Sequence, residues 1–251
     1  FRRDLIPDGC RTVFFPGCSL PGSRPEAVVS LYRRLRNLES TAGLVLDCCG
    51  KISHDLGMKK QFSALLSVLV QRLASRGVQR IVTSCPGCST ILTRYANGLE
   101  VTSIYELLAA TGPPAASPGD PPSTVVTIHV PCTARFDAAQ QRAIRTLVQS
   151  CGYRVKELTS SGSQTRCCGQ GGMVEGCLPG TVTREATQLA VEAADRLLVT
   201  SCGGCCETLA AVTPSIHVAD LLNNGKALHR PPLSSARRWI NRLKLRFTRF
   251  S

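Results

Sequence analysis

An internal duplication constrains the fold of this chain more than any other feature. The segment at residues 81–88 returns 117 residues later, at residues 198–205. Three further landmarks recur in the same order: Cys18 as Cys132, Cys48-Cys49-Gly50 as Cys167-Cys168-Gly169, and residues 104–108 as residues 218–222. Self-similarity of this kind indicates that one supersecondary unit is used twice. We therefore expect two similar lobes.

Each half of the chain alternates between strand-like and helix-like stretches. Short apolar runs predict strands at residues 11–15, 78–84, 125–130 and 197–201. Apolar residues at helical spacing predict helices at residues 25–38, 58–76, 136–151 and 181–196. The alternation predicts an α/β fold with two pseudo-symmetric lobes, each a small, mainly parallel sheet with flanking helices.

The composition changes between the two halves. Residues 113–123 are rich in proline, glycine, alanine and serine, which is typical of a connection rather than of a core element. We therefore predict four segments: a first cysteine-rich lobe at residues 1–112, a linker at 113–124, a second cysteine-rich lobe at 125–228 and a basic amphipathic tail at 229–251.

Ten of the fourteen cysteines form two sets of five that follow the duplication. The first set is Cys18, Cys48, Cys49, Cys85 and Cys88, and the second is Cys132, Cys167, Cys168, Cys202 and Cys205. These cysteines follow predicted strands, and parallel strands end at the same edge of a sheet, so we expect each set to converge there. A structural zinc site is closed by four ligands, whereas an iron–sulfur cluster can use five thiolates. The pattern favours iron–sulfur sites in a reducing compartment, with structural zinc as the alternative.

These ten positions resemble the duplicated C…CCG…CxxC motif of the cysteine-rich CCG domain in heterodisulfide reductase catalytic subunits and related iron–sulfur oxidoreductases. The resemblance extends from about residue 11 to residue 222. It implies that the ten cysteines bind the cofactor and its metal, as two noncubane 4Fe-4S clusters at which a disulfide substrate is cleaved. In some relatives, cysteine-rich subunits of membrane-associated dehydrogenases, one copy is degenerate or carries zinc. The first lobe is where we expect such an exception, because only 29 residues separate Cys18 from Cys48.

We expect a heterodisulfide-reductase-like redox subunit that passes electrons through two five-cysteine sites to a disulfide substrate. The alternatives are an electron-relay subunit and a zinc-stabilised scaffold subunit of a membrane-associated, quinone-linked dehydrogenase. Whether the chain is itself an enzyme therefore stays open. The sequence lacks the ferredoxin signature C-x-x-C-x-x-C-x-x-x-C-P. A ferredoxin-like subunit, or a domain ahead of Phe1, is the expected electron donor.

Several cysteines and histidines lie outside this pattern. His54 and His129 are candidate proton donors because disulfide reduction consumes protons, although a structural role is the commoner one for such histidines. The remaining cysteines are interpreted as small apolar filler: Cys10, Cys151, Cys177 and Cys206. Cys206 adds a sixth thiol beside the second set.

The formal net charge is +13, and basic residues gather at the C-terminal end of the chain. Residues 234–250 place Trp239, Phe247 and Phe250 on one broad face of a predicted helix. Such a helix is solvated, lies in a membrane interface or docks onto a membrane-embedded partner. The longest apolar run, residues 62–70, is too short to cross a bilayer, and no signal peptide is visible. We expect a cytoplasmic protein, peripheral on the inner face of the membrane, that does not bind nucleic acid.

Overall fold

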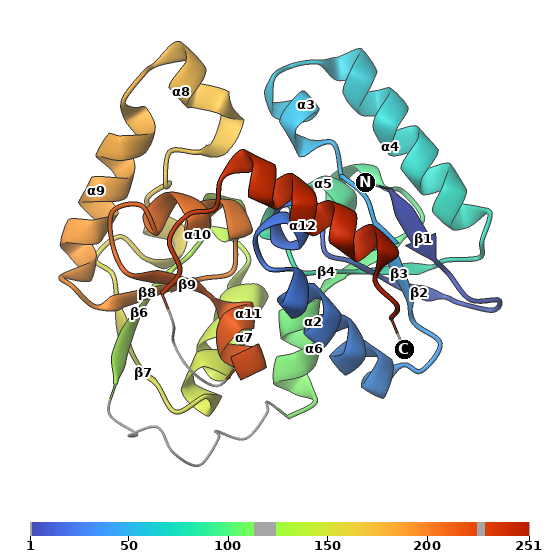
Figure 1. Ribbon diagram of the computed structural model, residues 1–251, viewed down its shortest axis with the longest axis horizontal. Helices are drawn as coiled ribbons and strands as arrows, with labels where there is room; N and C mark the ends of the chain where they lie inside the picture. Colours follow the sequence, from blue (N-terminus) through green and yellow to red (C-terminus); the bar gives the residue numbers. More distant parts are fainter. Residues whose placement is uncertain (1, 113–123, 225–228, 251) are drawn as a thin grey trace. The chain divides into compact units, whose positions relative to one another are not determined.

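The computed structural model of the chain describes residues 2–112, 124–224 and 229–250. The chain divides into two compact units, one of Phe1–Ile104 with Leu233–Ser251 and one of Tyr105–Pro232. Each unit contains one mainly parallel sheet with its own helices (Figure 1), so the predicted α/β class with two lobes is confirmed. The predicted linker, residues 113–124, lies outside the described residues except for Thr124.

The first unit contains a five-stranded sheet in the order β1-β3-β2-β4-β5. Its strands are β1 (Arg3–Leu5), β2 (Thr12–Phe15), β3 (Gly43–Leu46), β4 (Arg80–Thr83) and β5 (Glu100–Ser103). The pairs are parallel except for β1 with β3, which is antiparallel. Strands β2 and β3 are buried along their whole length, which is expected where helices cover a parallel sheet on both faces. The predicted strands at residues 11–15 and 78–84 are confirmed as β2 and β4.

The helices of the first unit follow the strands in alternation. They are α1 (Ser19–Ser23), α2 (Pro25–Leu38), α3 (Lys51–Asp55), α4 (Lys59–Ala74), α5 (Pro86–Tyr95) and, from the C-terminal end of the chain, α12 (Ser235–Phe247). Helix α6 (Ile104–Ala110) begins at the boundary between the units. Proline opens both α2 and α5, where its missing N–H needs no intrahelical partner. The predictions at residues 25–38 and 58–76 are confirmed as α2 and α4.

The second unit repeats this order with a four-stranded, fully parallel sheet, β7-β6-β8-β9. Its strands are β6 (Val125–His129), β7 (Arg154–Glu157), β8 (Leu197–Thr200) and β9 (Ser215–His217). Its helices are α7 (Ala138–Ser150), α8 (Val174–Cys177), α9 (Thr181–Ala193), α10 (Gly203–Leu209) and α11 (Val218–Asn224), with short 3-10 turns η1 (Cys132–Ala134), η2 (Gly162–Gln164) and η3 (Gly171–Met173). The central strands β6 and β8 therefore correspond to β2 and β4.

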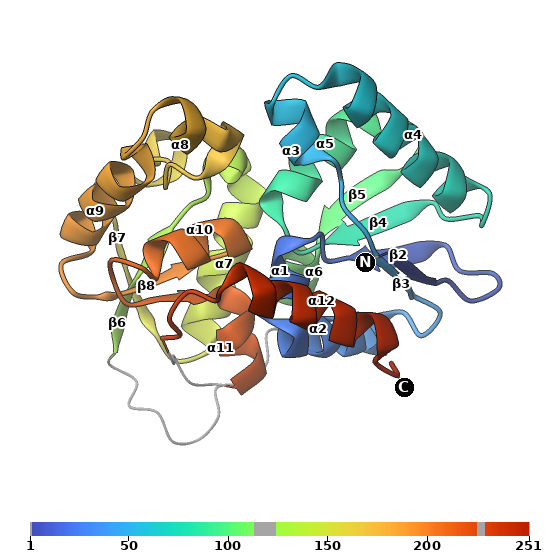
Figure 2. The same ribbon diagram turned by 45° about the horizontal axis from the view of Figure 1, so that its top comes forward.

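Helix α12 packs against α1 and α2 of the first unit (Figure 2). Leu245 is 1% exposed there, and the Arg3 guanidinium donates hydrogen bonds to the carbonyls of Leu245, Arg246 and Thr248. The grouping of Phe250 with Trp239 and Phe247 on one helix face is wrong. Helix α12 ends at Phe247, and the Phe250 ring meets the Tyr32 ring edge-on, with 5.8 Å between centroids.

Among the described residues, no helix combines the length and the apolar composition needed to span a bilayer.

Candidate metal centres

The five cysteines of the first set lie at the carboxyl ends of the parallel strands. Cys18 follows β2 at the start of α1, Cys48 and Cys49 follow β3, and Cys85 and Cys88 lie at the start of α5 after β4. The Sγ atoms of Cys18 and Cys48 are 3.9 Å apart. Thiol contacts continue from Cys48 to Cys49, from Cys49 to Cys88 and from Cys88 to Cys85. The structure therefore brings all five thiols of this set together.

The second set has the same arrangement in the second unit. Cys132 follows β6 and opens η1, while Cys202 and Cys205 lie at the start of α10 after β8. The Sγ atoms of Cys168 and Cys205 are 3.3 Å apart, and Cys167 contacts both Cys132 and Cys168. Its cysteine pair is reached through η2, ten residues after β7 ends, whereas Cys48 lies two residues after β3. The longer segment between β7 and Cys167 explains why Cys18 and Cys48 are closer in sequence than Cys132 and Cys167.

The close thiols compete for protons within each set. Hydrogen bonds from neighbouring thiols lower the pKa of Cys48 and of Cys167 to about 2. The same thiol–thiol hydrogen bonds raise the pKa of Cys18 and of Cys132. One cysteine of each set is thus favoured as thiolate while its neighbours keep their protons. Metal binding displaces thiol protons, so a bound cation would favour the thiolate form of the whole set.

The glycine of each Cys-Cys-Gly motif has a backbone conformation that orients its N–H. The φ angle is +76° at Gly50 and +84° at Gly169, a left-handed region that glycine adopts without a steric penalty. In each case the N–H donates to the sulfur two residues earlier, at 3.4 Å, which is Cys48 in the first unit and Cys167 in the second. The motif therefore supplies one N–H···S hydrogen bond per set.

The donor chemistry of both sets fits a thiolate-bound centre. Soft thiolates select zinc, copper(I) and iron–sulfur clusters, and five of them exceed the four ligands that close a structural zinc site. A Cβ at Gly17 would lie 2.8 Å from the Sγ of Cys88, so glycine allows the backbone to approach the sulfur. The two sets are compatible with iron–sulfur clusters. Within residues 2–112, 124–224 and 229–250, no three His, Cys, Asp or Glu side chains are arranged as ligands of a single metal ion.

Two cationic side chains that were not among the predicted site residues lie beside the first set. The Nε of Arg242, on α12, donates to the carbonyl of Cys18 at 2.9 Å, and its charge helps to lower the pKa of Cys48. Lys51 follows the Cys-Cys-Gly motif, and its Cδ would lie 3.0 Å from a Cβ at Gly87.

The neutral Gln170 takes the place of Lys51 in the second unit, where its Oε1 would lie 2.6 Å from a Cβ at Gly204. Alignment of the two halves pairs Gln170 with Lys51, so this difference was accessible from the sequence. The contact of Arg242 with Cys18 was not, because 224 residues separate them.

The predicted proton donor His129 is buried at the end of β6, beneath the second set. Its Nε2 lies 3.2 Å from the carbonyl oxygen of Arg166, and its Nδ1 lies 3.3 Å from Oγ1 of Thr200. Because a carbonyl only accepts, Nε2 carries the proton and Nδ1 accepts from the hydroxyl. Burial lowers the pKa of His129. This neutral ring ties β6 to β8 and to the residue before Cys167.

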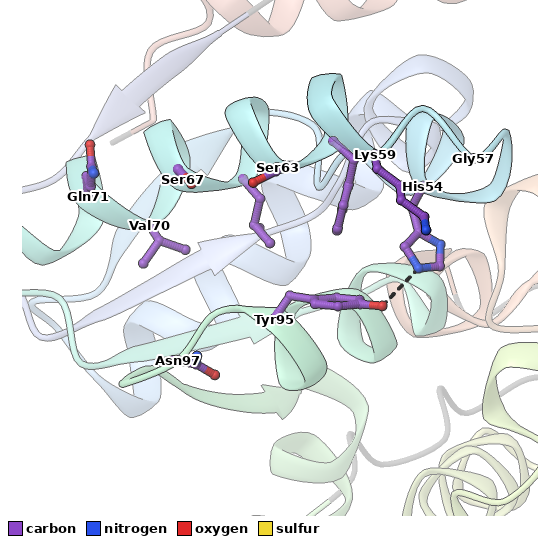
Figure 3. A pocket seen from close by; sticks show the side chains of 11 residues that line it. His54, Gly57, Lys59, Ser63, Ser67, Val70, Gln71, Tyr95 and Asn97 are labelled. Carbon is purple, nitrogen blue, oxygen red and sulfur yellow. Dashed lines mark hydrogen bonds between the residues drawn. The ribbon is translucent and has the colours of Figure 1, made fainter.

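The other predicted donor, His54, lies on α3 at one end of a pocket of about 650 Å³ between α4 and α5 (Figure 3). Its Nδ1 lies 3.1 Å from Oδ1 of Asp55, and its Nε2 lies 3.1 Å from the hydroxyl of Tyr95. Although burial raises the pKa of Asp55, hydrogen bonds from Lys51 and His54 outweigh it and hold that pKa below its usual value. The described residues that line the pocket include no cysteine, so His54 faces a space apart from the first set.

The four cysteines outside the motifs have different surroundings. Cys10 is buried and its thiol donates to the carbonyl of Thr12 at 3.1 Å. Cys151 and Cys206 are also buried, whereas Cys177 is exposed. Cys206 is next to Cys205 in α10 but is fully buried.

Two solved structures that match this chain are distant likenesses. A glutamate racemase from Bacillus anthracis matches with a TM-score of 0.37 and 12% identity, over 87% of this chain and 80% of the racemase. A glutamate racemase from Aquifex pyrophilus matches with a TM-score of 0.36 and 14% identity, over 93% of this chain and 94% of the racemase. Likenesses this weak establish neither a shared fold nor a shared function. A search of curated protein sequences found no match.

The model of the CCG cysteine-rich domain matches residues 12–93 and again residues 126–210. The two matches cover most of the chain, and each contains all five cysteines of one set. The chain belongs to the CCG family of cysteine-rich domains and contains two copies of that domain.

Proposed function

We propose that this chain is an iron–sulfur redox subunit, similar to heterodisulfide reductase, that reduces a disulfide substrate. In this proposal each five-cysteine set holds one noncubane 4Fe-4S cluster. The supporting observation is the gathering of five thiols in each CCG copy, with sulfur–sulfur distances of 3.9 Å in the first set and 3.3 Å in the second. Sets of five thiolates suit a centre with several irons better than they suit zinc.

Reduction of a disulfide consumes two electrons and two protons and releases two thiols. When bound, the clusters would supply one-electron transfer and iron atoms that can accept sulfur. The chain itself would hold the thiolates and orient N–H groups toward two of them. Each set has three partly exposed cysteines and two buried ones, so we infer that substrate sulfur approaches the partly exposed side. The three partly exposed cysteines are Cys18, Cys48 and Cys85 in the first set and Cys132, Cys167 and Cys202 in the second.

The proposal includes a ferredoxin-like electron donor, because the sequence carries no ferredoxin signature of its own. It also places the chain in a reducing compartment, the cytoplasm, because clusters of thiols at these distances would otherwise be oxidised. An electron relay without a substrate, in a quinone-linked dehydrogenase, is the alternative within redox chemistry, and a zinc-stabilised scaffold is the alternative outside it.

Metal analysis of anaerobically purified protein tests the cluster assignment. We expect about eight iron atoms and as many sulfides per chain, two clusters of four, with a signal in electron paramagnetic resonance. Cys205→Ser should lose about half of the iron, whereas Cys177→Ser, outside both sets and exposed, should keep it. Stoichiometric zinc without iron would reject the proposal in favour of the scaffold.

A disulfide reduction assay then separates enzyme from relay. The loaded protein, with reduced methyl viologen as donor, is offered a panel of low-molecular-weight disulfides, and thiol release is measured. We expect release that Cys205→Ser abolishes and Cys177→Ser preserves. Full iron content with no thiol release from any disulfide would support the relay instead.

A further inference from the structure

Helix α12 exposes a continuous apolar face. Four large apolar side chains, spaced so that they share one side of a helix, are 45–73% exposed: Trp239, Ile240, Leu243 and Phe247. Three of them, with Lys244, line a shallow groove along the helix. Exposed apolar patches that polar residues surround mark sites of interaction. The cysteine sites do not account for this exposed apolar face.

The opposite face of α12 fixes this orientation. Asn241 is buried, and its Nδ2 donates to the carbonyl of Gly22 at 2.8 Å. Leu245 is 1% exposed, and Arg242 donates to the carbonyl of Cys18. Turning the apolar face inward would break all of these contacts. The exposed face is thus the outer side of a helix that is fastened to the first unit.

The charged side chains of α12 itself all have one sign. Arg237, Lys244 and Arg246 are exposed on α12, and the sequence contains no aspartate or glutamate after Asp220. The Arg242 guanidinium lies 5.0 Å from the centre of the Trp239 ring. A helix with exposed aromatic and aliphatic residues on one side and lysine and arginine beside them is suited to the interface of a bilayer with anionic headgroups.

We propose that the exposed face of α12 inserts into the headgroup region of an anionic lipid bilayer and holds the chain on the membrane surface. The aromatic and aliphatic side chains supply apolar burial, and the basic side chains pair with lipid phosphates. Because α12 also contacts the Cys18 loop, docking places the first cysteine set close to the bilayer. The proposal does not depend on which metal the cysteines bind.

Sedimentation with lipid vesicles tests the proposal on the full chain. We expect binding to phosphatidylcholine vesicles that contain phosphatidylglycerol and much weaker binding to phosphatidylcholine alone. Trp239 is the single tryptophan of the sequence, so its emission should shift to shorter wavelength on binding. The double variant Leu243→Ala and Phe247→Ala retains this reporter and should weaken binding by about tenfold or more. Lys244→Gln with Arg246→Gln should weaken it by a similar factor.

Phe136→Ala is the matched control, because Phe136 is an 85% exposed aromatic side chain in the second unit; it should bind as the parent does. Deletion of α12 is avoided, since it would also uncover the partners of Leu245. Equal binding by parent and double variant, or no emission shift with anionic vesicles, would overturn the proposal. A dimer in light scattering that the double variant dissociates, without vesicle binding by the parent, would show that a second copy covers the face instead.

Discussion

Replacing Gly169 with alanine should destabilise the second unit more than replacing Gly180, although both have nearly the same backbone conformation. The φ angle is +84° at Gly169 and +83° at Gly180. A Cβ at Gly169 would lie 2.9 Å from the Cα of Val182, whereas a Cβ at Gly180 would meet no atom within 4 Å. The pair therefore separates backbone strain, which both variants share, from a collision that affects one.

The magnitudes follow from these two contributions. A left-handed alanine costs about 1–2 kcal/mol, partly offset by about 0.5 kcal/mol from the lower entropy of the unfolded chain. Gly180→Ala should therefore lower the free energy of unfolding by about 1 kcal/mol. The collision at Gly169 is with backbone, which cannot rotate away, and overpacking of this kind adds about 1–3 kcal/mol. The two variants should differ by that amount.

Urea unfolding, followed by circular dichroism, measures this difference on metal-free protein. The transition of the second unit is fitted separately, because two units need not unfold together. Equal destabilisation, within about 0.5 kcal/mol, would refute the reasoning. Under the proposed iron–sulfur assignment, iron content gives a second readout. Gly169→Ala should lower iron binding at the second set, because the motif backbone shifts, while Gly180→Ala should leave it unchanged.

Three further predictions address the first unit. Leu245→Ala should lower the free energy of unfolding by about 2–5 kcal/mol in urea titrations, and Leu243→Ala by less than about 0.5 kcal/mol. The reason is that Leu245 is 1% exposed and Leu243 is 54% exposed. Equal effects would contradict the packing of α12. The pKa of Asp55 is lower in the folded state than its ordinary 3.8. The stability that this carboxylate contributes is therefore present above about pH 4 and is lost as the pH falls below that value. In unfolding experiments at pH 3–7, Asp55→Asn should lose less of its unfolding free energy on acidification than the parent does. Arg242→Met removes a charge beside Cys18. Under the proposed iron–sulfur assignment, this change should lower the reduction potential of the first centre by on the order of 40 mV, about 1 kcal/mol, and leave the second centre unchanged. A potentiometric titration that moves both potentials equally would count against this assignment.

The elements that the sequence predicted well are those that bury apolar side chains. The runs at residues 11–15 and 125–130 became β2 and β6, because central strands of a parallel sheet are buried on both faces and mostly apolar. The edge strands β1 and β7 contain no continuous apolar run. Strand β7 is Arg-Val-Lys-Glu and mostly exposed, and β1, Arg-Asp-Leu, pairs antiparallel with β3. Backbone hydrogen bonds to a neighbouring strand, rather than side-chain periodicity, place strands of this kind.

Part of the candidate sites could likewise be predicted from the sequence, and part could not. The ten cysteines could be selected because a repeated spacing can be read directly from the sequence, and their convergence follows from the rule that parallel strands end together. The positive φ of the Cys-Cys-Gly glycine, and the particular sulfur that its N–H meets, are seen only in the folded backbone.

The family, the two lobes and the division of ten cysteines into two sets can therefore be read from the sequence, because chain order and local spacing carry that information. Only the folded chain shows which side of α12 is buried, where Phe250 lies and which cation is beside Cys18. Those contacts join residues more than 200 positions apart, and their pairing depends on packing between elements, which local periodicity does not encode.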